Sequence, residues 1–200
     1  MKIKDRRKKM NLPNKLSIFR IILVPIMAVI PIFNIQGEVL NIPITFLIIN
    51  IIFIIASITD KLDGYIARKN NQITEFGKII DSVADKILVV SAMIILVQFG
   101  KLPSWIAIIV TLREILVMAY KSKKSMAANM WGRIKAVMQI IAIILAFIDI
   151  NNFGDVFRGA LTGGAFYLNL LVTISMIIAV IATILSGWNY LKDGKDLMNN

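Results

Sequence analysis

Residues 42–86 read IPITFLIINIIFIIASITDKLDGYIARKNNQITEFGKIIDSVADK. The part from residue 42 to residue 59 contains no charged side chain and is long enough for a helix that crosses the hydrocarbon core of a bilayer. Four aspartates follow, Asp60, Asp63, Asp81 and Asp85, and a second apolar run begins among them. This pattern predicts two membrane helices joined by a short connection, with acidic side chains gathered at the membrane boundary.

The composition also indicates a membrane protein. Of the 200 residues, 58% are apolar and 18% are charged, whereas soluble domains contain about 45–50% apolar residues even when glycine is counted. The sequence has no Cys and no His, which excludes disulfides, thiolate metal sites and imidazole acid–base chemistry. A bound metal would have to take oxygen ligands, and such ligands favour Mg²⁺ or Mn²⁺.

Six apolar stretches have the length of a membrane-spanning helix. They are Leu16–Ile35, Ile42–Thr59, Ile79–Phe99, Ser104–Tyr120, Ile134–Ile150 and Phe166–Ser186. We therefore expect an all-α membrane protein with six transmembrane helices. Residues 1–200 would form a single domain, in which residues 1–14 are a basic cytoplasmic lead-in.

The distribution of Lys and Arg predicts the orientation in the membrane. If both termini are cytoplasmic, only Lys101, Arg113 and Arg158 of the 23 basic residues lie away from the cytoplasmic edge. This bias is the one expected from the positive-inside rule. The net charge of +11 then reflects contact with anionic lipid headgroups rather than with nucleic acid, and we expect no nucleic-acid partner.

The spacing of the four aspartates places them on facing helix surfaces. Asp60 and Asp63 are three residues apart, and Asp81 and Asp85 are four apart, so each pair shares a helix face. Carboxylates held together repel one another unless cations lie among them. We expect one or two divalent ions, with Asp60, Asp63 and Asp81 as plausible ligands. Asp85, one turn further along, could remain without metal and act as a base toward a hydroxyl group.

Small and basic residues accompany the aspartates. Gly64, Ala67 and Gly77 continue the acidic faces and offer no bulk, which lets a ligand approach the helix backbones. Arg68 supplies a planar guanidinium suited to phosphate oxygens. These features together predict a site for a diphosphate at the boundary between lipid and water.

Residues 60–85 match every fixed position of the pattern D-x-x-D-G-x-x-A-R, eight residues, G-x-x-x-D-x-x-x-D. In this pattern the chain resembles the CDP-alcohol phosphatidyltransferases. The flanks are similar to those of bacterial members that use glycerol 3-phosphate. They are Asn11–Arg20, Arg113–Glu114, Gly132–Lys135 and Leu185–Tyr190.

The resemblance implies a six-helix enzyme of the CDP-alcohol phosphotransferase fold. It would transfer the phosphatidyl group of CDP-diacylglycerol to glycerol 3-phosphate and release CMP. The implied two-metal centre, with Mg²⁺ or Mn²⁺, lies at Asp60, Asp63, Asp81 and Asp85, and Asp85 is also the implied general base. The implied CDP-binding residues are Asp60, Asp63, Gly64, Ala67, Arg68, Gly77 and Asp81. The resemblance further implies a homodimer in the bacterial cytoplasmic membrane, with its active site facing the cytoplasm.

The acceptor is inferred from the remaining cations. Arg20, Arg113 and Lys135 could meet the phosphate of glycerol 3-phosphate, and Lys121 stands where similar enzymes have an arginine. Arg113 matters most, because an arginine inside an apolar helix costs about 2.5–3.5 kcal/mol on insertion scales. We expect Glu114, its neighbour, to face elsewhere and to be a poor partner for it. Inositol phosphate, serine and phosphatidylglycerol remain alternative acceptors.

A cation transporter that uses the aspartates as its ion site is the rival from another functional class. It predicts metal-dependent flux, no nucleotide binding and no need for Gly64 or Ala67. Ion sites of transporters lie near the bilayer midplane, whereas these carboxylates are grouped at one boundary. The sequence therefore favours the enzyme.

Overall fold

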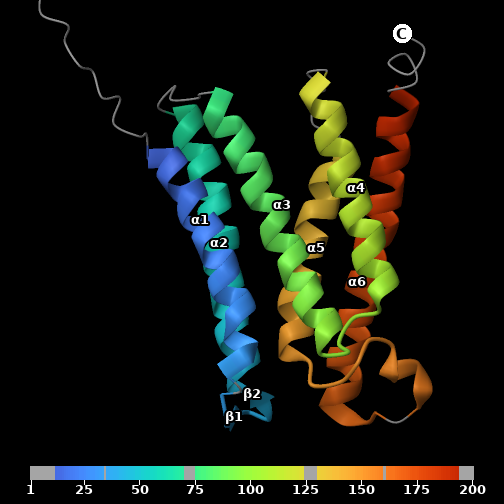
Figure 1. Ribbon diagram of the computed structural model, residues 1–200. Coiled ribbons are helices and arrows are strands. Elements are labelled where there is room, and N and C mark those ends of the chain that lie inside the picture. Colours follow the sequence, from blue (N-terminus) through green and yellow to red (C-terminus); the bar gives the residue numbers. More distant parts are fainter. Residues whose placement is uncertain (1–11, 34, 70–74, 124–129, 160, 194–200) are drawn as a thin grey trace, which may run out of the picture.

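The computed structural model describes residues 12–33, 35–69, 75–123, 130–159 and 161–193, and most of these residues are helical (Figure 1). The long helices are α1 (Leu12–Val29), α2 (Ile44–Lys69), α3 (Glu75–Gln98), α4 (Ser104–Lys123), α5 (Met130–Ile148) and α6 (Gly163–Asp193). Short elements connect some of them: the 3-10 helices η1 (Ile30–Phe33) and η2 (Asp155–Arg158), and the strands β1 (Glu38–Val39) and β2 (Ile42–Pro43).

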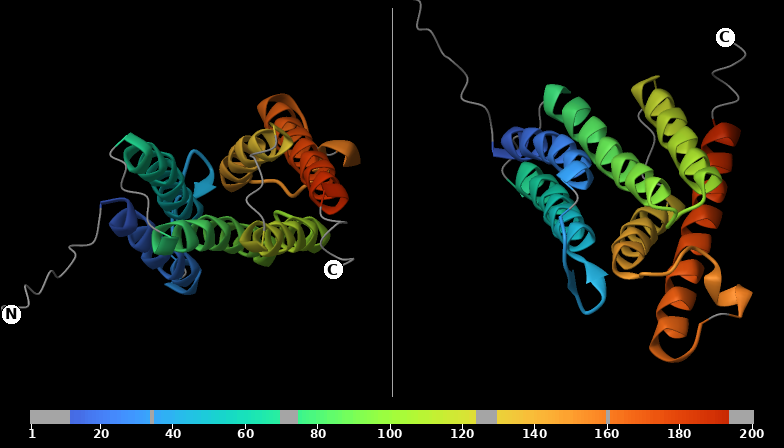
Figure 2. Two further views of the ribbon diagram at one scale, coloured as in Figure 1. Left: turned by 90° about the horizontal axis from the view of Figure 1, so that it is seen from above. Right: turned by 60° about the horizontal axis from the view of Figure 1, so that its bottom comes forward.

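The long helices alternate in direction along the bundle. Figure 1 places the start of α1, the end of α2, the start of α3 and the end of α6 at the same end of the molecule. We call this the aspartate end, because Asp60 and Asp81 lie toward it, and we call the opposite end the far end. Helix α3 runs obliquely between the pair α1 and α2 and the pair α5 and α6, and α4 lies beside α6 (Figures 1 and 2).

The predicted all-α class is confirmed, with one small addition. Strands β1 and β2 pair antiparallel, with Val39 opposite Ile42. Leu40 and Asn41 join them with positive φ angles of 54° and 64°, the backbone of a tight hairpin turn. The sequence analysis had treated this segment only as a turn between two helices.

Two helical stretches among the described residues are long and apolar enough, on their own, to cross a membrane. They are Asn14–Phe33 and Gly163–Trp188, and the apolar stretches Ile44–Asp60 and Ile134–Ile148 are shorter. Charged residues interrupt the apolar stretches of three other predicted spans: the aspartates and lysines of the central motif lie inside α2 and α3, and Arg113 and Glu114 lie inside α4.

Apolar side chains cover much of the outer surface. Ile22 on α1, Leu112 on α4 and Ile181 on α6 are each more than half exposed. Soluble monomers rarely expose such wide apolar surfaces. The surface therefore fits a bilayer, and the protein is a membrane protein.

The interior holds the two halves of the bundle together. Phe53 of α2, Met93 of α3, Ile143 of α5 and Met176 of α6 are fully or almost fully buried and belong to one apolar cluster. Because a close-packed interior deforms little, this cluster fixes the positions of the polar side chains that lie toward the aspartate end.

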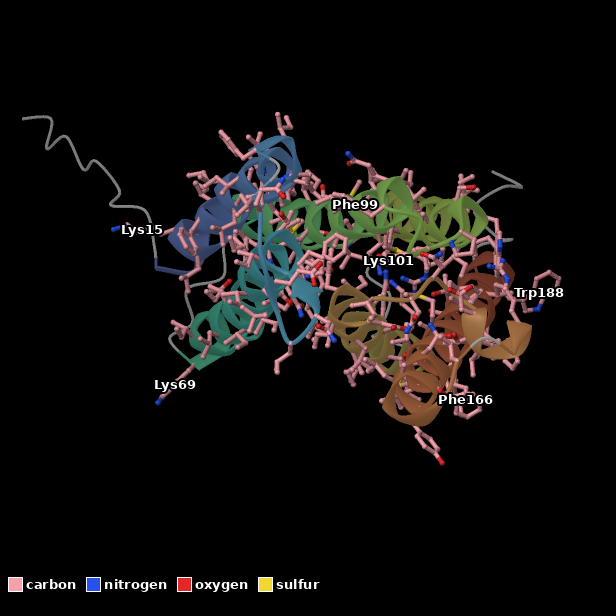
Figure 3. All side chains as sticks on the ribbon, turned by 90° about the horizontal axis from the view of Figure 1, so that it is seen from below. Lys15, Lys69, Phe99, Lys101, Phe166 and Trp188 are labelled. Atoms are coloured by element: carbon pink, nitrogen blue, oxygen red, sulfur yellow. The ribbon has the colours of Figure 1, made fainter. Side chains whose placement is uncertain are left out.

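Lys101 ties the far end of the bundle together. Its side chain is buried, and its ammonium donates hydrogen bonds to the carbonyl oxygens of Asp149 (2.9 Å), Ile150 and Asn151 (3.4 Å). These carbonyls follow the last turn of α5, where backbone acceptors lack helical partners and a cation is favoured. Figure 3 shows Lys101 among the helices, whereas Lys15 and Lys69 project outward. Burial lowers the pKa of Lys101, and the Asp149 carboxylate acts in the opposite direction.

We expect Lys101→Met to destabilise the protein by about 1–3 kcal/mol, because buried carbonyl oxygens would lose their donor. Thermal unfolding in detergent would measure the loss. Arg158→Gln is the matched control: Arg158 forms an exposed ion pair with Asp155, so its loss should change the stability by less than about 0.5 kcal/mol. Equal melting temperatures for Lys101→Met and the unsubstituted protein would contradict this account.

Candidate active site

Arg20 of α1 lies at the centre of the first polar cluster. Its side chain is fully buried, and its Nη1 atom donates to Oδ1 of Asp60 at 2.6 Å and to Oδ1 of Asp81 at 3.4 Å. Asp60 comes from α2 and Asp81 from α3, so one guanidinium joins three helices. The structure thus brings together two of the four aspartates of the motif, with a positive charge between them.

Four further residues of the motif lie in α2: Asp63, Gly64, Ala67 and Arg68. The structure describes these four residues only as part of the helix. Gly77 lies in the first turns of α3, one turn before Asp81. Within the described residues, no group of three or more acidic side chains is arranged to hold a metal ion.

The donor set nevertheless fits a hard cation. Two carboxylate oxygens from different helices already converge on one cationic nitrogen, and carboxylates are the ligands that Mg²⁺ and Mn²⁺ prefer. The α2 helix continues without a break from Asp60 through Asp63, so the three-residue spacing of these two aspartates is a helical one.

Asp85 lies one turn beyond Asp81 on α3 and faces a separate cavity. The cavity has a volume of about 30 Å³, and its polar lining residues are Asp85, Lys86, Glu114, Lys135 and Gln139. Asp85 also forms an ion pair with Lys86 at 3.8 Å. A larger groove of about 240 Å³ between α3 and α4 shares Lys86 and Glu114 with this cavity and is otherwise lined mostly by apolar side chains.

Glu114 lies at the centre of the second polar cluster, and here the prediction from sequence was wrong. Its Oε1 atom accepts hydrogen bonds from Nη1 of Arg113 at 3.1 Å and from Nζ of Lys135. Glu114 and Lys135 are both buried. Adjacent helix positions point in different directions, but long side chains can bend toward a shared partner, and Lys135 of α5 supplies that partner.

Arg113 reaches from α4 to α6. Its Nη2 atom donates to Oγ of Ser186, which is fully buried. Two glycines border the side chain: a Cβ at Gly187 would lie 3.4 Å from Cγ of Arg113, and a Cβ at Gly132 would lie 3.7 Å from Nη2, both at ordinary contact distance. The sequence analysis did not identify Ser186 as a partner of Arg113, although a polar residue in a long apolar helix is a signal for one.

The four residues predicted to bind an acceptor phosphate therefore lie in different places. Arg113 and Lys135 come together through Glu114, whereas Arg20 contacts Asp60 and Asp81. Lys121 belongs to α4, and its side chain is outside the described part of the structure.

The family model for CDP-alcohol phosphatidyltransferases matches residues 10–188, which is most of the chain. The chain belongs to the CDP-alcohol phosphatidyltransferase family. The match contains both polar clusters, because Arg20 and Ser186 fall within it. The assignment from the aspartate motif is confirmed.

Bacterial relatives carry one common name, CDP-diacylglycerol–glycerol-3-phosphate 3-phosphatidyltransferase. The protein of Bacillus subtilis is 39% identical over 190 residues, which cover 90% of this chain and 93% of the relative. The protein of Haemophilus influenzae is 34% identical over 203 residues, covering 96% and 98%. That of Rickettsia bellii is 33% identical over 187 residues, covering 91% and 94%.

We expect Glu114→Gln to destabilise this phosphatidyltransferase by about 3–5 kcal/mol, because removal of one partner leaves buried cations uncompensated. Thermal unfolding of the purified protein would measure the change. Glu114→Asp keeps the charge on a shorter side chain and should therefore lose less stability than Glu114→Gln. If Glu114→Gln and Glu114→Asp unfold at the same temperature, charge pairing at this position is not what stabilises the cluster.

Proposed function

We propose that this membrane enzyme transfers the phosphatidyl group of CDP-diacylglycerol to glycerol 3-phosphate, yielding phosphatidylglycerophosphate and CMP. The observation that carries the proposal is the complete aspartate motif, in a chain that is 30–39% identical to relatives named for this reaction. The contacts of Asp60 and Asp81 with one cation, and the position of Asp85 in a cavity that Lys86 and Lys135 also line, support it.

The donor would bind at the first cluster. Mg²⁺ or Mn²⁺ would be held by Asp60, Asp63, Asp81 and Asp85. Such ions, when bound, neutralise the diphosphate and the charge that develops on the departing CMP. Gly64, Ala67 and Gly77 would leave space for the CDP moiety, and Arg68 would contact its phosphates. Asp60, Asp63 and Asp81 would also border the CDP moiety.

The acceptor would bind at the second cluster. The hydroxyl oxygen of the acceptor attacks the phosphorus that carries the diacylglycerol, the bond from that phosphorus to CMP breaks, and Asp85 takes the hydroxyl proton. Lys135, which lines the same cavity as Asp85, would hold the acceptor phosphate within reach of this base. Arg113 and Lys121 would add positive charge, and Arg20 would face the donor.

Charge selects the acceptor. Glycerol 3-phosphate brings a phosphate dianion, which the net positive charge of Arg113, Lys135 and Glu114 would attract, whereas serine is zwitterionic and phosphatidylglycerol carries its own acyl chains. Inositol phosphate has the same phosphate chemistry as glycerol 3-phosphate and is the acceptor to compare with it.

The setting of the enzyme follows from the charge distribution. We propose that all six long helices span the bacterial cytoplasmic membrane, with both termini and the aspartate end facing the cytoplasm, where most Lys and Arg residues would lie. We also propose that the enzyme is a homodimer, as its resemblance to the CDP-alcohol phosphatidyltransferases implies.

We expect the purified protein to release CMP from CDP-diacylglycerol only when glycerol 3-phosphate and Mg²⁺ or Mn²⁺ are both present. Chelation with EDTA should stop release, and inositol phosphate or serine should replace glycerol 3-phosphate poorly. The measurement is CMP formed per enzyme under saturating donor. Metal flux into proteoliposomes without any CMP release would instead favour the cation transporter.

We expect Asp85→Asn to lower kcat by about 10²–10⁴-fold, the contribution of a general base. CDP-diacylglycerol binding should be largely retained, because Asp60, Asp63 and Asp81 would still hold the ions that bind the diphosphate. Binding is measured by equilibrium titration with the lipid in detergent, beside the turnover assay. Full turnover in Asp85→Asn would refute the base assignment.

A further inference from the structure

Gln139 is a buried amide in an otherwise apolar part of α5. The residue is 1% exposed. Among the described residues, its Nε2 atom donates a hydrogen bond to Sδ of Met93 at 3.7 Å. A thioether sulfur is a weak acceptor, and a buried amide without strong partners destabilises the fold. Packing alone would be served better by an apolar side chain of similar shape, so the amide requires another explanation.

The position of Gln139 relates it to the cavity beside Asp85. Gln139 follows Lys135 by four residues on α5, so both residues lie on the same helix face, with Gln139 one turn further from the aspartate end. Both line the cavity, as does Asp85 from α3. The cavity thus has a cation toward the aspartate end, a carboxylate on one side and an amide deeper in the bundle.

The size of the cavity indicates what it can hold. A volume of about 30 Å³ accommodates about two groups of the size of a water molecule, because one water needs at least about 10–15 Å³. The five lining residues other than Val89, Ala136 and Ile140 all carry charge or an amide. The space therefore suits hydroxyl groups and is too small for an acyl chain or a nucleotide.

We propose that Gln139 hydrogen-bonds the acceptor hydroxyl that does not react, and so selects a phosphorylated vicinal diol. The inference rests on the proposed function. With the acceptor phosphate at Lys135 and the reacting hydroxyl at Asp85, the neighbouring hydroxyl of glycerol 3-phosphate enters the inner part of the cavity. There the amide of Gln139 donates a hydrogen bond to this hydroxyl or accepts one from it. Gln139 thereby gains a stronger hydrogen-bond partner than the sulfur of Met93.

The test compares two acceptors that differ by one hydroxyl: glycerol 3-phosphate and 3-hydroxypropyl phosphate, which lacks the hydroxyl on the central carbon. The measurement is kcat/KM for each, from CMP release at saturating CDP-diacylglycerol and Mg²⁺. We expect the unsubstituted enzyme to prefer glycerol 3-phosphate by about tenfold or more, because a site built to hydrogen-bond a hydroxyl rejects the analogue that lacks it. In Gln139→Met, which keeps the length of the side chain, the preference should fall to about threefold or less.

Asn50→Leu is the matched control. Asn50 is another buried amide, which donates from α2 to the carbonyl oxygen of Ile144 on α5 at 3.2 Å and does not line the cavity. Its loss should leave the acceptor preference unchanged, even if the overall activity falls.

Each contrary result is distinguishable. A preference retained in Gln139→Met, or lost equally in Asn50→Leu, would overturn the role of Gln139. If Gln139→Met does not fold, the comparison of the two acceptors with the unsubstituted enzyme still tests the inference. Equal kcat/KM values for the two acceptors would overturn it. No CMP release with either acceptor would overturn the proposed function, and this inference with it.

Discussion

Charge neutralisation inside an apolar bundle is the constraint on which the rest of this structure depends. Asp60 and Asp81 are brought together by two helices, and Arg20 from a third helix neutralises part of their charge. The side chain of Arg20 is fully buried, whereas those of Asp60 and Asp81 are 29% and 45% exposed. Such half-buried pairs contribute little net stability, because desolvation of the cation offsets their attraction, but leaving the buried cation without partners is costly. Arg20 therefore matters less as a source of stability than as the residue that fixes how α1, α2 and α3 meet.

The two polar clusters have opposite charge arrangements. In the first, one cation lies between two carboxylates, whereas in the second, Glu114 accepts from the two cations Arg113 and Lys135. The first cluster carries excess negative charge and is suited to divalent ions, and the second carries excess positive charge and is suited to a phosphate dianion. Charge alone would thus direct a metal-bound donor and an anionic acceptor to different sites in one bundle.

Periodicity predicted the helical class and the side of the bundle on which the aspartates lie, because hydrophobic runs and three- and four-residue spacings are local properties. The partners of those residues depend on tertiary packing. The orientation of Glu114 was predicted from its position beside Arg113 on one helix, but its second partner, Lys135, comes from α5. Gln139 gave no distinct signal, since a single amide in an apolar run is indistinguishable from a tolerated packing residue until the cavity beside it is known.

Helix α3 connects the two clusters, and its geometry sets their separation. Asp81 contacts Arg20 in the first cluster, and Asp85 lines the cavity of the second. Four residues of α-helix rise by about 6 Å along the axis, so the two carboxylates belong to adjacent turns of one rigid element. A transfer between a donor and an acceptor requires two ligands side by side with the reacting atoms about 3–3.5 Å apart. Because α3 is continuous from Asp81 to Asp85, the proposed donor and acceptor sites would lie on adjacent turns of one helix.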